Sequence, residues 1–525
     1  MSLHPFDAEG QFHPIAEGDL LRRVAVRGAG TTLVASGASF CLQLISTVVL
    51  ARLLTPNDFG VVTMVTTFSL LFCSFGLNGF SEVILQREDV THSLASNLFW
   101  INLGAGVSLS IVFACLGPLM ARFYHDPLVK SVAEGMSLTI VAGSLSVVHL
   151  ALLNRATRFS AVAANTVVAY TVSVVVSIVL ALVGWGYWAL VTGYIAQRIS
   201  ISIGAWIMCR WTPCLPRRVA GTAASVKFAL NVYWHFGFSY FTGNIDNLLV
   251  GWRYGAPTLG VYKKAFDLFY LPANQLLSPI AGIAIATLSR FKSDRAYYQR
   301  HLLAGISLLA FVGMGVGADF TLVGRDMIRF ILGPGWAESG RIFTFFGPGI
   351  GVMLLYNTHG WIHISAGRPD RWFRWGAIEF IWTVGLFVVA LPWGPSGVAL
   401  AWTASSLTLM LPAFWYAGKP IGLGVTPVIA VIWKFFAASI LAGCGAAWLI
   451  RVAPLFATTG GARGAFFRAA ADSVLFFALY LCVVVVLHRG LAPIRQTGRV
   501  IMEMLPDSSA NRDAIRAAGT AKSLV

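Results

Sequence analysis

Several charged side chains lie in or beside long apolar segments of this sequence, where a charge is expensive. They are the basic residues Arg198, Arg253, Lys263 and Lys264, and the acidic residues Asp246, Asp267 and Glu379. A charge near the centre of a bilayer costs at least about 2.5–3.5 kcal/mol, so one that persists there usually lines a cavity or has a partner. A carboxylate in such a place could take up a proton or a sodium ion. These residues are therefore the candidates for binding chemistry.

Each candidate also has a structural interpretation. Arg198, near the middle of an apolar run, could be held by a partner inside a helix bundle. Lys263 and Lys264 could extend to lipid headgroups from the end of a helix. The two aspartates could pair with these neighbouring cations and neutralise the helix ends. The sequence leaves both interpretations open.

The composition requires a membrane environment for these charges. Hydrophobic residues make up 57% of the chain, charged residues 11%, and the mean hydropathy is +0.73. A helical span needs roughly 20 apolar residues, and about fourteen runs satisfy this. Their limits are 29–54, 58–80, 93–120, 129–153, 161–184, 187–208, 228–251, 258–289, 301–323, 342–365, 372–391, 396–416, 427–450 and 470–488. Because the runs are long and continuous, we predict an all-α polytopic membrane protein rather than a barrel.

Two turns in the sequence match each other. "TPNDFG" ends at Gly60 and "GAPTLG" ends at Gly260, and each lies between two apolar runs. A second match joins "GWGYWALVTG" to "PWGPSGVALAW", with Gly186 aligned to Gly397. An even number of predicted crossings separates the copies, so the pattern predicts two six-helix lobes as parallel repeats, plus two C-terminal helices. Short Gly and Pro turns can also resemble each other by chance.

The predicted organisation follows from these repeats and from the charge distribution. Roughly 24 Lys and Arg residues fall on one side and roughly 12 on the other, which favours cytoplasmic termini. The first helix is expected to remain uncleaved, because 1–28 has no signal-peptide pattern. The predicted parts are a cytoplasmic N-terminal segment (1–28), an N-terminal lobe (29–208), a basic cytoplasmic linker (209–227), a C-terminal lobe (228–416), two further helices (417–488) and a cytoplasmic tail (489–525).

Several kinds of chemistry find no support in the sequence. The net charge of +16 suits anionic lipid headgroups better than nucleic acid, because the basic residues cluster beside membrane spans. "GAPTLGVYK" lacks the Lys-Ser/Thr pair of a phosphate-binding loop, so ATP hydrolysis is not expected. His359 and His363 lie one helical turn apart but have neither a catalytic Glu nor a third ligand, so no metal site is predicted. We expect no cofactor and no enzymatic activity.

Three segments resemble bacterial polysaccharide flippases of the Wzx kind. They are "ARLLTPNDFGVVTMVTTFSLLFCSFGLNGFSEVILQRED" (51–89), "GWGYWALVTGYIAQR" (184–198) and "IDNLLVGWRYGAPTLGVYKKAFDLFYLPANQLLSPIAGIAIATLSR" (245–290). The superfamily also contains multidrug extruders of the MATE type and the lipid II flippase. The resemblance covers roughly residues 28–416.

This resemblance implies a substrate and a location. The expected substrate is an undecaprenyl-pyrophosphate-linked oligosaccharide, moved by alternating access across the bacterial inner membrane for exopolysaccharide, capsule or O-antigen biosynthesis. Arg198, Arg253, Lys263 and Lys264 would then hold the pyrophosphate or an acidic sugar, and Asp246, Asp267 and Glu379 would couple transport to Na+ or H+. Membrane lipids, a polysaccharide polymerase and a co-polymerase are the candidate partners.

Two other functions remain open at this point. One is a cation-coupled multidrug exporter of the same superfamily, which the two parallel lobes would also suit. The other is a membrane glycosyltransferase or polysaccharide polymerase, but such enzymes usually carry a long extramembrane loop or a paired-carboxylate motif. The nearest match to such a motif is Asp326 and Glu338.

Overall fold

The structure is a computed structural model of the 525-residue chain. It describes residues 5–7, 9–12, 18–87, 89–217, 219, 221–291, 294–453 and 460–495. Side chains are described throughout these ranges except at 18–29, 76–78, 231, 234–235, 238–239, 242, 271–280, 283, 286 and 369. The predicted C-terminal tail lies outside the described residues from position 496 onward.

Helices account for almost all of the described chain, and no β-strand occurs within the described residues beyond isolated bridges such as Phe6 with Phe12. The α-helices are α1 (Gly18–Leu53), α2 (Pro56–Gln86), α3 (His92–Tyr124), α4 (Leu128–Ser144), α5 (Val147–Arg155), α6 (Phe159–Leu182), α7 (Tyr187–Cys209), α8 (Thr222–Thr242), α9 (Ile245–Arg290), α10 (Arg295–Ile331), α11 (Ala337–Ser365), α12 (Pro369–Ala390), α13 (Gly394–Gly418), α14 (Val425–Val452) and α15 (Gly461–His488). Three short 3-10 helices, Pro334–Trp336, Leu391–Trp393 and Lys419–Ile421, connect some of them.

The predicted fold class is confirmed, because every predicted span overlaps a helix. Among the described residues, nine stretches have the length and composition of a membrane span, and one of these, Asp370–Ile421, covers both α12 and α13. The other predicted spans fall on α7, α8, α9 and α11. The protein is therefore an all-helical, multi-pass membrane protein.

Several helices extend beyond the predicted spans. Helix α1 begins at Gly18 rather than near residue 29, and α10 begins at Arg295 rather than near residue 301. Helix α10 has 37 residues and is therefore about 55 Å long, against a hydrocarbon core of about 30 Å. An apolar run marks the part of a helix inside the hydrocarbon, whereas the helix continues with polar residues outside it.

The chain divides into two compact units. Unit 1 comprises Met1–Lys264, Ile331–Glu338 and Phe387–Val398, and unit 2 comprises Ala265–Phe330, Ser339–Leu386 and Ala399–Val525. The lobe boundaries expected from the sequence repeats stay a prediction.

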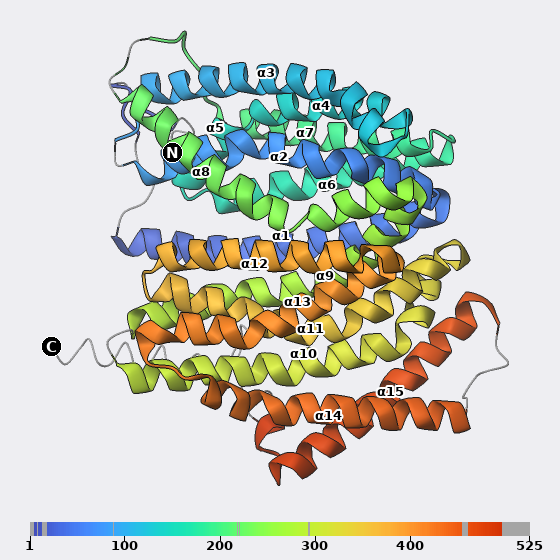
Figure 1. Ribbon diagram of the computed structural model, residues 1–525. Helices are drawn as coiled ribbons and strands as arrows, with labels where there is room; N and C mark the ends of the chain where they lie inside the picture. The colour runs from blue at the N-terminus through green and yellow to red at the C-terminus, as the bar shows by residue number, and fades with distance from the viewer. Residues whose placement is uncertain are drawn as a thin grey trace. The chain divides into compact units, whose positions relative to one another are not determined.

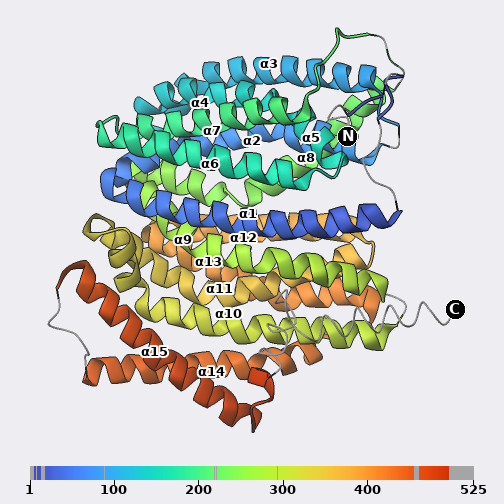
Figure 2. The same cartoon turned by 180° about the vertical axis from the view of Figure 1, so that it is seen from behind.

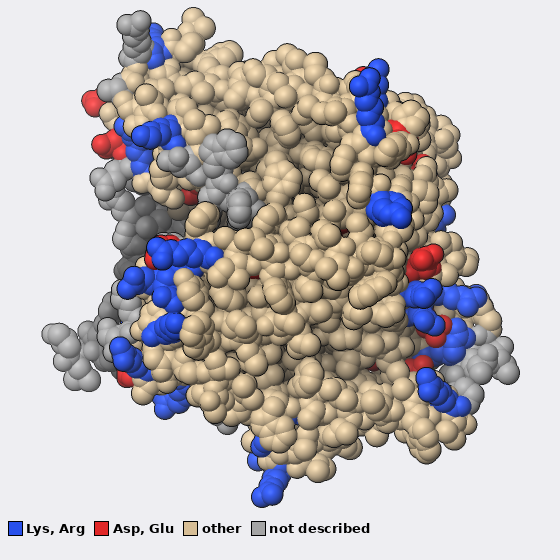
Figure 3. Space-filling model, viewed as in Figure 1, with Lys and Arg blue, Asp and Glu red and all other residues tan. Residues whose placement is uncertain are grey.

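The helices of each unit lie side by side (Figures 1 and 2). In unit 1, α3 packs on α4, and α6 packs on both α1 and α7. In unit 2, α10 and α11 approach closely through glycines, because a Cβ added to Gly313 would lie 3.0 Å from the Cα of Gly351. On the face in Figure 3, charged side chains gather at the helix ends, and few lie on the helix surfaces between the ends. This distribution fits spans that cross a hydrocarbon layer.

A buried cluster joins the N-terminal segment to the linker between α7 and α8. Trp211 of the linker is 1% exposed, and its ring lies 6.2 Å from Phe6 and 5.0 Å from His149. Asn97 of α3 donates to the Arg217 carbonyl (2.6 Å) and accepts from the Arg217 backbone N–H (2.9 Å). The linker is therefore attached to α3 at Arg217.

The two matched turns of the sequence are in direct contact. In unit 1, a Cβ built on Gly60 would overlap the carbonyl oxygen of Ala256, and one built on Gly260 would overlap the carbonyl oxygen of Pro56. Gly255 has φ 77°, which allows α9 to reverse direction between its first ten residues and its longer second part. We call this contact the glycine junction (Gly60, Gly255, Ala256 and Gly260).

Local sequence builds the α2 side of the glycine junction. Thr55 and Asp58 form a capping box, in which Asp58 accepts from the Thr55 backbone N–H (2.9 Å) and Thr55 accepts from the Asp58 backbone N–H (3.3 Å). Pro56 occupies the first turn, where its missing N–H costs nothing. Trp336 packs edge-on against Phe59 at 5.4 Å and donates its indole N–H to the Ala51 carbonyl (2.7 Å). These contacts fix where α2 begins.

We expect Gly60→Ala to destabilise the protein by about 1–3 kcal/mol, because the added methyl group has no room beside the Ala256 carbonyl. The measurement is thermal unfolding of the purified protein in detergent, followed by tryptophan fluorescence. Gly104→Ala is the matched control, since Gly104 is a helical residue of α3 with open space around it. Equal melting temperatures for the two variants would contradict the close approach at the glycine junction.

Candidate functional site

Asp246 lies at the reversal of α9, inside unit 1. Its side chain is 2% exposed, and the Tyr262 hydroxyl donates to its Oδ2 at 2.7 Å. Lys263 interacts electrostatically with the same carboxylate. Asp246 Oδ1 has no hydrogen-bond partner among the described residues. Tyr262 is thus the hydrogen-bond donor to the Asp246 carboxylate, and Lys263 lies within electrostatic range of it.

The other basic candidates near Asp246 have different surroundings. Lys264 is 8% exposed, and its ammonium lies 4.0 Å from the centre of the Phe59 ring, a cation–π contact beside the glycine junction. Arg253 is exposed, and its guanidinium lies 5.5 Å from the centre of the Tyr254 ring. Asp267 is half-buried on α9. The structure therefore brings together Asp246 and Lys263, and it places Arg253 on the surface.

Arg198 lies in the middle of α7, which packs against α2 and α4. Its side chain is half-buried, close to Gly143 of α4 and within electrostatic range of Cys73 of α2. Within the part of the chain that the structure describes, no hydrogen bond or ion pair to the Arg198 guanidinium is found. Such a cation in a spanning helix is able to hold an anion.

Glu379 lies in unit 2, on α12. Its side chain is partly buried, within hydrogen-bonding reach of the Tyr356 hydroxyl of α11. The same hydroxyl accepts the indole N–H of Trp375 at 2.9 Å. His359 and His363 continue along α11, with ring centres 5.8 Å apart. The seven candidates thus divide between units, with Glu379 in unit 2 and Asp246 in unit 1.

A group of polar side chains between α10 and α15 was not predicted from the sequence. Arg468 donates two hydrogen bonds to Asp326, at 3.1 and 2.5 Å, and Ser473 donates to Asp319 at 3.2 Å. Asp472 interacts electrostatically with both aspartates of α10. A signal was present, because Arg468 and Asp472 are one helical turn apart beside an apolar run. The predicted span began at 470 and so separated them.

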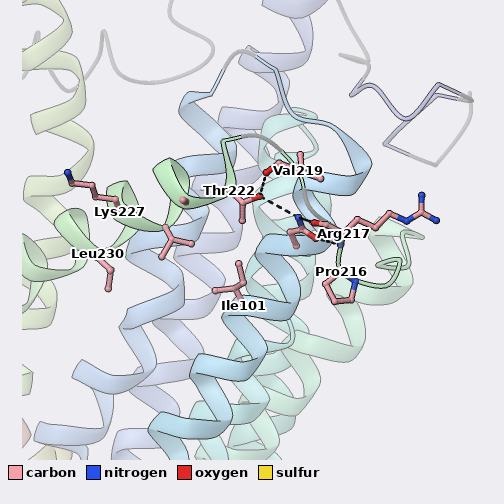
Figure 4. A pocket seen from close by; sticks show the side chains of 10 residues that line it. Ile101, Pro216, Arg217, Val219, Thr222, Lys227 and Leu230 are labelled. Atoms are coloured by element: carbon pink, nitrogen blue, oxygen red, sulfur yellow. Dashed lines mark hydrogen bonds between the residues drawn. The ribbon is translucent and has the colours of Figure 1, made fainter.

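A pocket of about 990 Å³ opens where the linker meets α3 and α8 in unit 1 (Figure 4). Apolar residues make up most of its lining, and Asn97, Thr222, Arg217 and Lys227 are the polar members. Arg217 and Lys227 extend in opposite directions, away from Ile101. An apolar lining with basic side chains at both sides suits an apolar chain that carries an anionic group.

A family model described as "Polysaccharide biosynthesis protein" matches residues 49–341, more than half of the chain. The chain belongs to this family. The predicted resemblance is therefore confirmed, and all three quoted segments lie entirely inside the matched range together with most of the candidate residues. Glu379 lies beyond it.

Individual relatives carry related names. The chain is 20% identical over 380 residues to the succinoglycan biosynthesis transport protein ExoT of Rhizobium meliloti (strain 1021), covering 72% of this chain and 77% of the relative. It is 19% identical over 425 residues to the lipopolysaccharide biosynthesis protein WzxC of Escherichia coli (strain K12), covering 79% and 85%. It is also 21% identical to the teichuronic acid biosynthesis protein TuaB of Bacillus subtilis (strain 168) over 362 residues, covering 68% and 75%.

Solved structures share the fold. The lipid II flippase MurJ in an inward closed conformation matches with a TM-score of 0.71 at 14% identity, covering 87% of this chain and 98% of that chain. An inward-facing multidrug resistance transporter of the MATE family matches with a TM-score of 0.60 at 12% identity, covering 73% and 94%. At these identities the likeness concerns the arrangement of helices.

We expect Arg468→Ala to destabilise the protein by about 1–3 kcal/mol. The Arg468 and Asp326 side chains are only 21% and 29% exposed, so the change leaves a mostly buried carboxylate without its partner. The measurement is thermal unfolding in detergent. Lys130→Ala is the control, because its ion pair with Glu134 is 56% and 52% exposed and should change stability by less than about 0.5 kcal/mol. If Arg468→Ala were as mild as Lys130→Ala, the pair would not hold α15 on α10.

Proposed function

We propose that this protein is a flippase for a lipid-linked oligosaccharide in polysaccharide biosynthesis. It moves an undecaprenyl-pyrophosphate-linked oligosaccharide from the cytoplasmic to the periplasmic leaflet of the bacterial inner membrane by alternating access. Both termini lie in the cytoplasm, as the distribution of Lys and Arg favours. The product serves exopolysaccharide, capsule or O-antigen assembly, with a polymerase and a co-polymerase as further partners.

The observation that carries the proposal is the position of Arg198 in a chain of this family. The substrate carries a pyrophosphate, and its carrier needs a cation inside the membrane that is not already neutralised. Arg198 is half-buried in the middle of α7, with no hydrogen bond or ion pair among the described residues. We propose Arg198 as the principal pyrophosphate ligand, with Lys263, Lys264 and Arg253 in secondary roles.

The two alternative functions are less well supported. Multidrug exporters of the MATE family share the fold at 12% identity, whereas the family match and the named relatives concern polysaccharide biosynthesis. A glycosyltransferase or polymerase would need a catalytic carboxylate, and Asp326, the nearest candidate from the sequence, is occupied by Arg468. We therefore propose transport without enzymatic activity, coupled to Na+ or H+ through Asp246, Asp267 or Glu379.

The test uses a strain that lacks the gene, in which the lipid-linked oligosaccharide facing each side of the membrane is quantified. We expect cargo to accumulate on the cytoplasmic side and wild-type protein to restore export. Arg198→Ala should lower export at least about tenfold, because one charge-assisted contact to phosphate is worth roughly 1.5–3 kcal/mol. Arg198→Lys, which keeps the charge, should restore part of the activity.

Lys130→Ala is the control, since Lys130 is an exposed residue near the end of a helix. All variants are compared at equal protein levels in the membrane. If the null strain distributes its cargo normally while export of cationic dyes falls, the drug-exporter function replaces the flippase. If Arg198→Ala exports like wild type, Arg198 is not a ligand of the cargo.

A further inference from the structure

A column of polar side chains runs along the contact between α11 and α12 in unit 2. Tyr356, His359 and His363 are spaced by three and four residues, which places them on one face of α11. From α12, Trp375 and Glu379 meet this face, since Trp375 donates to the Tyr356 hydroxyl and Glu379 lies within its hydrogen-bonding reach. All of these positions belong to the same unit.

The two histidines are buried without the partners that buried imidazoles normally have. His363 is 0% exposed and His359 is 4% exposed. Three ring nitrogens have no hydrogen-bond partner among the described residues. They are both ring nitrogens of His363 and the Nε2 of His359. An unsatisfied buried polar atom costs about 1–3 kcal/mol, so three in one cluster require an explanation.

The hydrogen bonds define the state of His359 and Tyr356. His359 Nδ1 lies 2.5 Å from the Tyr356 carbonyl oxygen, which can only accept, so Nδ1 carries the proton and Nε2 of the neutral ring carries the lone pair. The Tyr356 hydroxyl oxygen accepts from Trp375, which leaves its own proton to donate to Glu379. Each group is thus oriented so that a proton can be passed along.

Charged groups reach the column at its two ends. Asp370 and Arg371, in the first turn of α12, both interact electrostatically with His363. Glu379 lies at the other end, next to Tyr356. From α13, the Tyr416 ring lies 5.8 Å from His363, and the Arg371 guanidinium lies 4.1 Å above the Tyr416 ring. His359 faces only Tyr356, Trp375 and His363 among the described rings.

We propose that His359 and His363 conduct a proton between the first turn of α12, at Asp370, and the carboxylate of Glu379. In this relay, the His363 imidazole binds a proton at the first turn of α12 and passes it to His359 Nε2. The Tyr356 hydroxyl gives its proton to Glu379, which becomes a carboxylic acid, and the His359 imidazolium returns one proton to the Tyr356 oxygen, whose ring centre lies 4.6 Å from that of His359. His363, His359 and Tyr356 therefore all end neutral. Only hydrogen changes its bonds in each step, and Glu379 then releases its proton toward the opposite side of the membrane. Ring centres 5.8 Å apart leave the two histidines within the span of one bridging water.

The chemistry of the column favours a proton over a sodium ion. Imidazole changes its charge near neutral pH and takes up a proton readily, whereas hard cations prefer oxygen ligands. This inference rests on the proposed function only in one respect, namely that the proton delivered to Glu379 drives transport. Proton conduction itself can be measured without any cargo.

The test uses the full-length protein in liposomes that enclose a pH-sensitive dye, with an imposed proton gradient. We expect wild-type protein to acidify the interior faster than empty liposomes, and His359→Gln and His363→Gln to slow this at least about tenfold. Glu379→Gln should be equally slow. His301→Gln is the matched control with an unchanged rate, because His301 lies on α10 and bonds the Tyr297 carbonyl (2.8 Å).

Two further readouts separate conduction from folding and from transport. Added 4-methylimidazole should restore proton uptake in His363→Ala, which a purely structural role would not allow. Movement of labelled lipid-linked oligosaccharide is followed in the same liposomes. Cargo movement without proton uptake would overturn the relay and leave the flippase proposal standing. Proton uptake without cargo movement would overturn the flippase proposal and leave the relay standing. Wild-type rates in both histidine variants would also overturn the relay, as would wild-type uptake that requires Na+.

Discussion

Direct contact between the Gly60 and Gly260 backbones determines how unit 1 is built. A Cβ at either position would overlap a main-chain carbonyl of the other turn, so the helices can meet at this distance only without side chains. The reversal at Gly255 brings the second part of α9 to this contact, and the capping box at Thr55 sets the first residue of α2. Phe59, Lys264 and Trp336 then pack around it.

The glycine junction also determines where charges can lie. Because α9 reverses at Gly255, Asp246 in its first part meets Tyr262 and Lys263 in its second part. The next residue, Lys264, instead places its ammonium group over the Phe59 ring. A buried carboxylate with a hydroxyl donor and a nearby ammonium is tolerable in a membrane protein, and one oxygen of Asp246 still has no partner among the described residues.

Two kinds of polar group lie between the helices of unit 2, those paired with each other and those without a hydrogen-bond partner among the described residues. Between α10 and α15, Arg468 and Asp326 neutralise each other with two hydrogen bonds, which is an arrangement for holding helices together. Between α11 and α12, ring nitrogens of the two buried histidines have no hydrogen-bond partner among the described residues. The paired charges hold α15 on α10, whereas buried polar groups without partners cost free energy and point to a role beyond packing.

Much of the fold was predictable from the sequence, because a hydrocarbon layer forces each apolar run of sufficient length into a helix. The match between the turns at Gly60 and Gly260 was also visible, but no pattern could reveal that these two glycines touch each other. For the candidate site, Glu379 was found from its position in an apolar run, whereas its link to Tyr356 depends on how α11 packs on α12. His359 and His363 were noted only as a metal spacing, since the sequence could not show that both are buried.

The most direct test of the flippase account uses purified protein alone, reconstituted in liposomes with a labelled polyprenyl-pyrophosphate oligosaccharide in the membrane. A membrane-impermeant glycosidase then reports which fraction faces outward over time. The account predicts that the protein makes the inner-leaflet cargo accessible without any nucleotide, and much faster than in empty liposomes. Accessibility that stays at the level of empty liposomes, with correctly folded protein present, would contradict it.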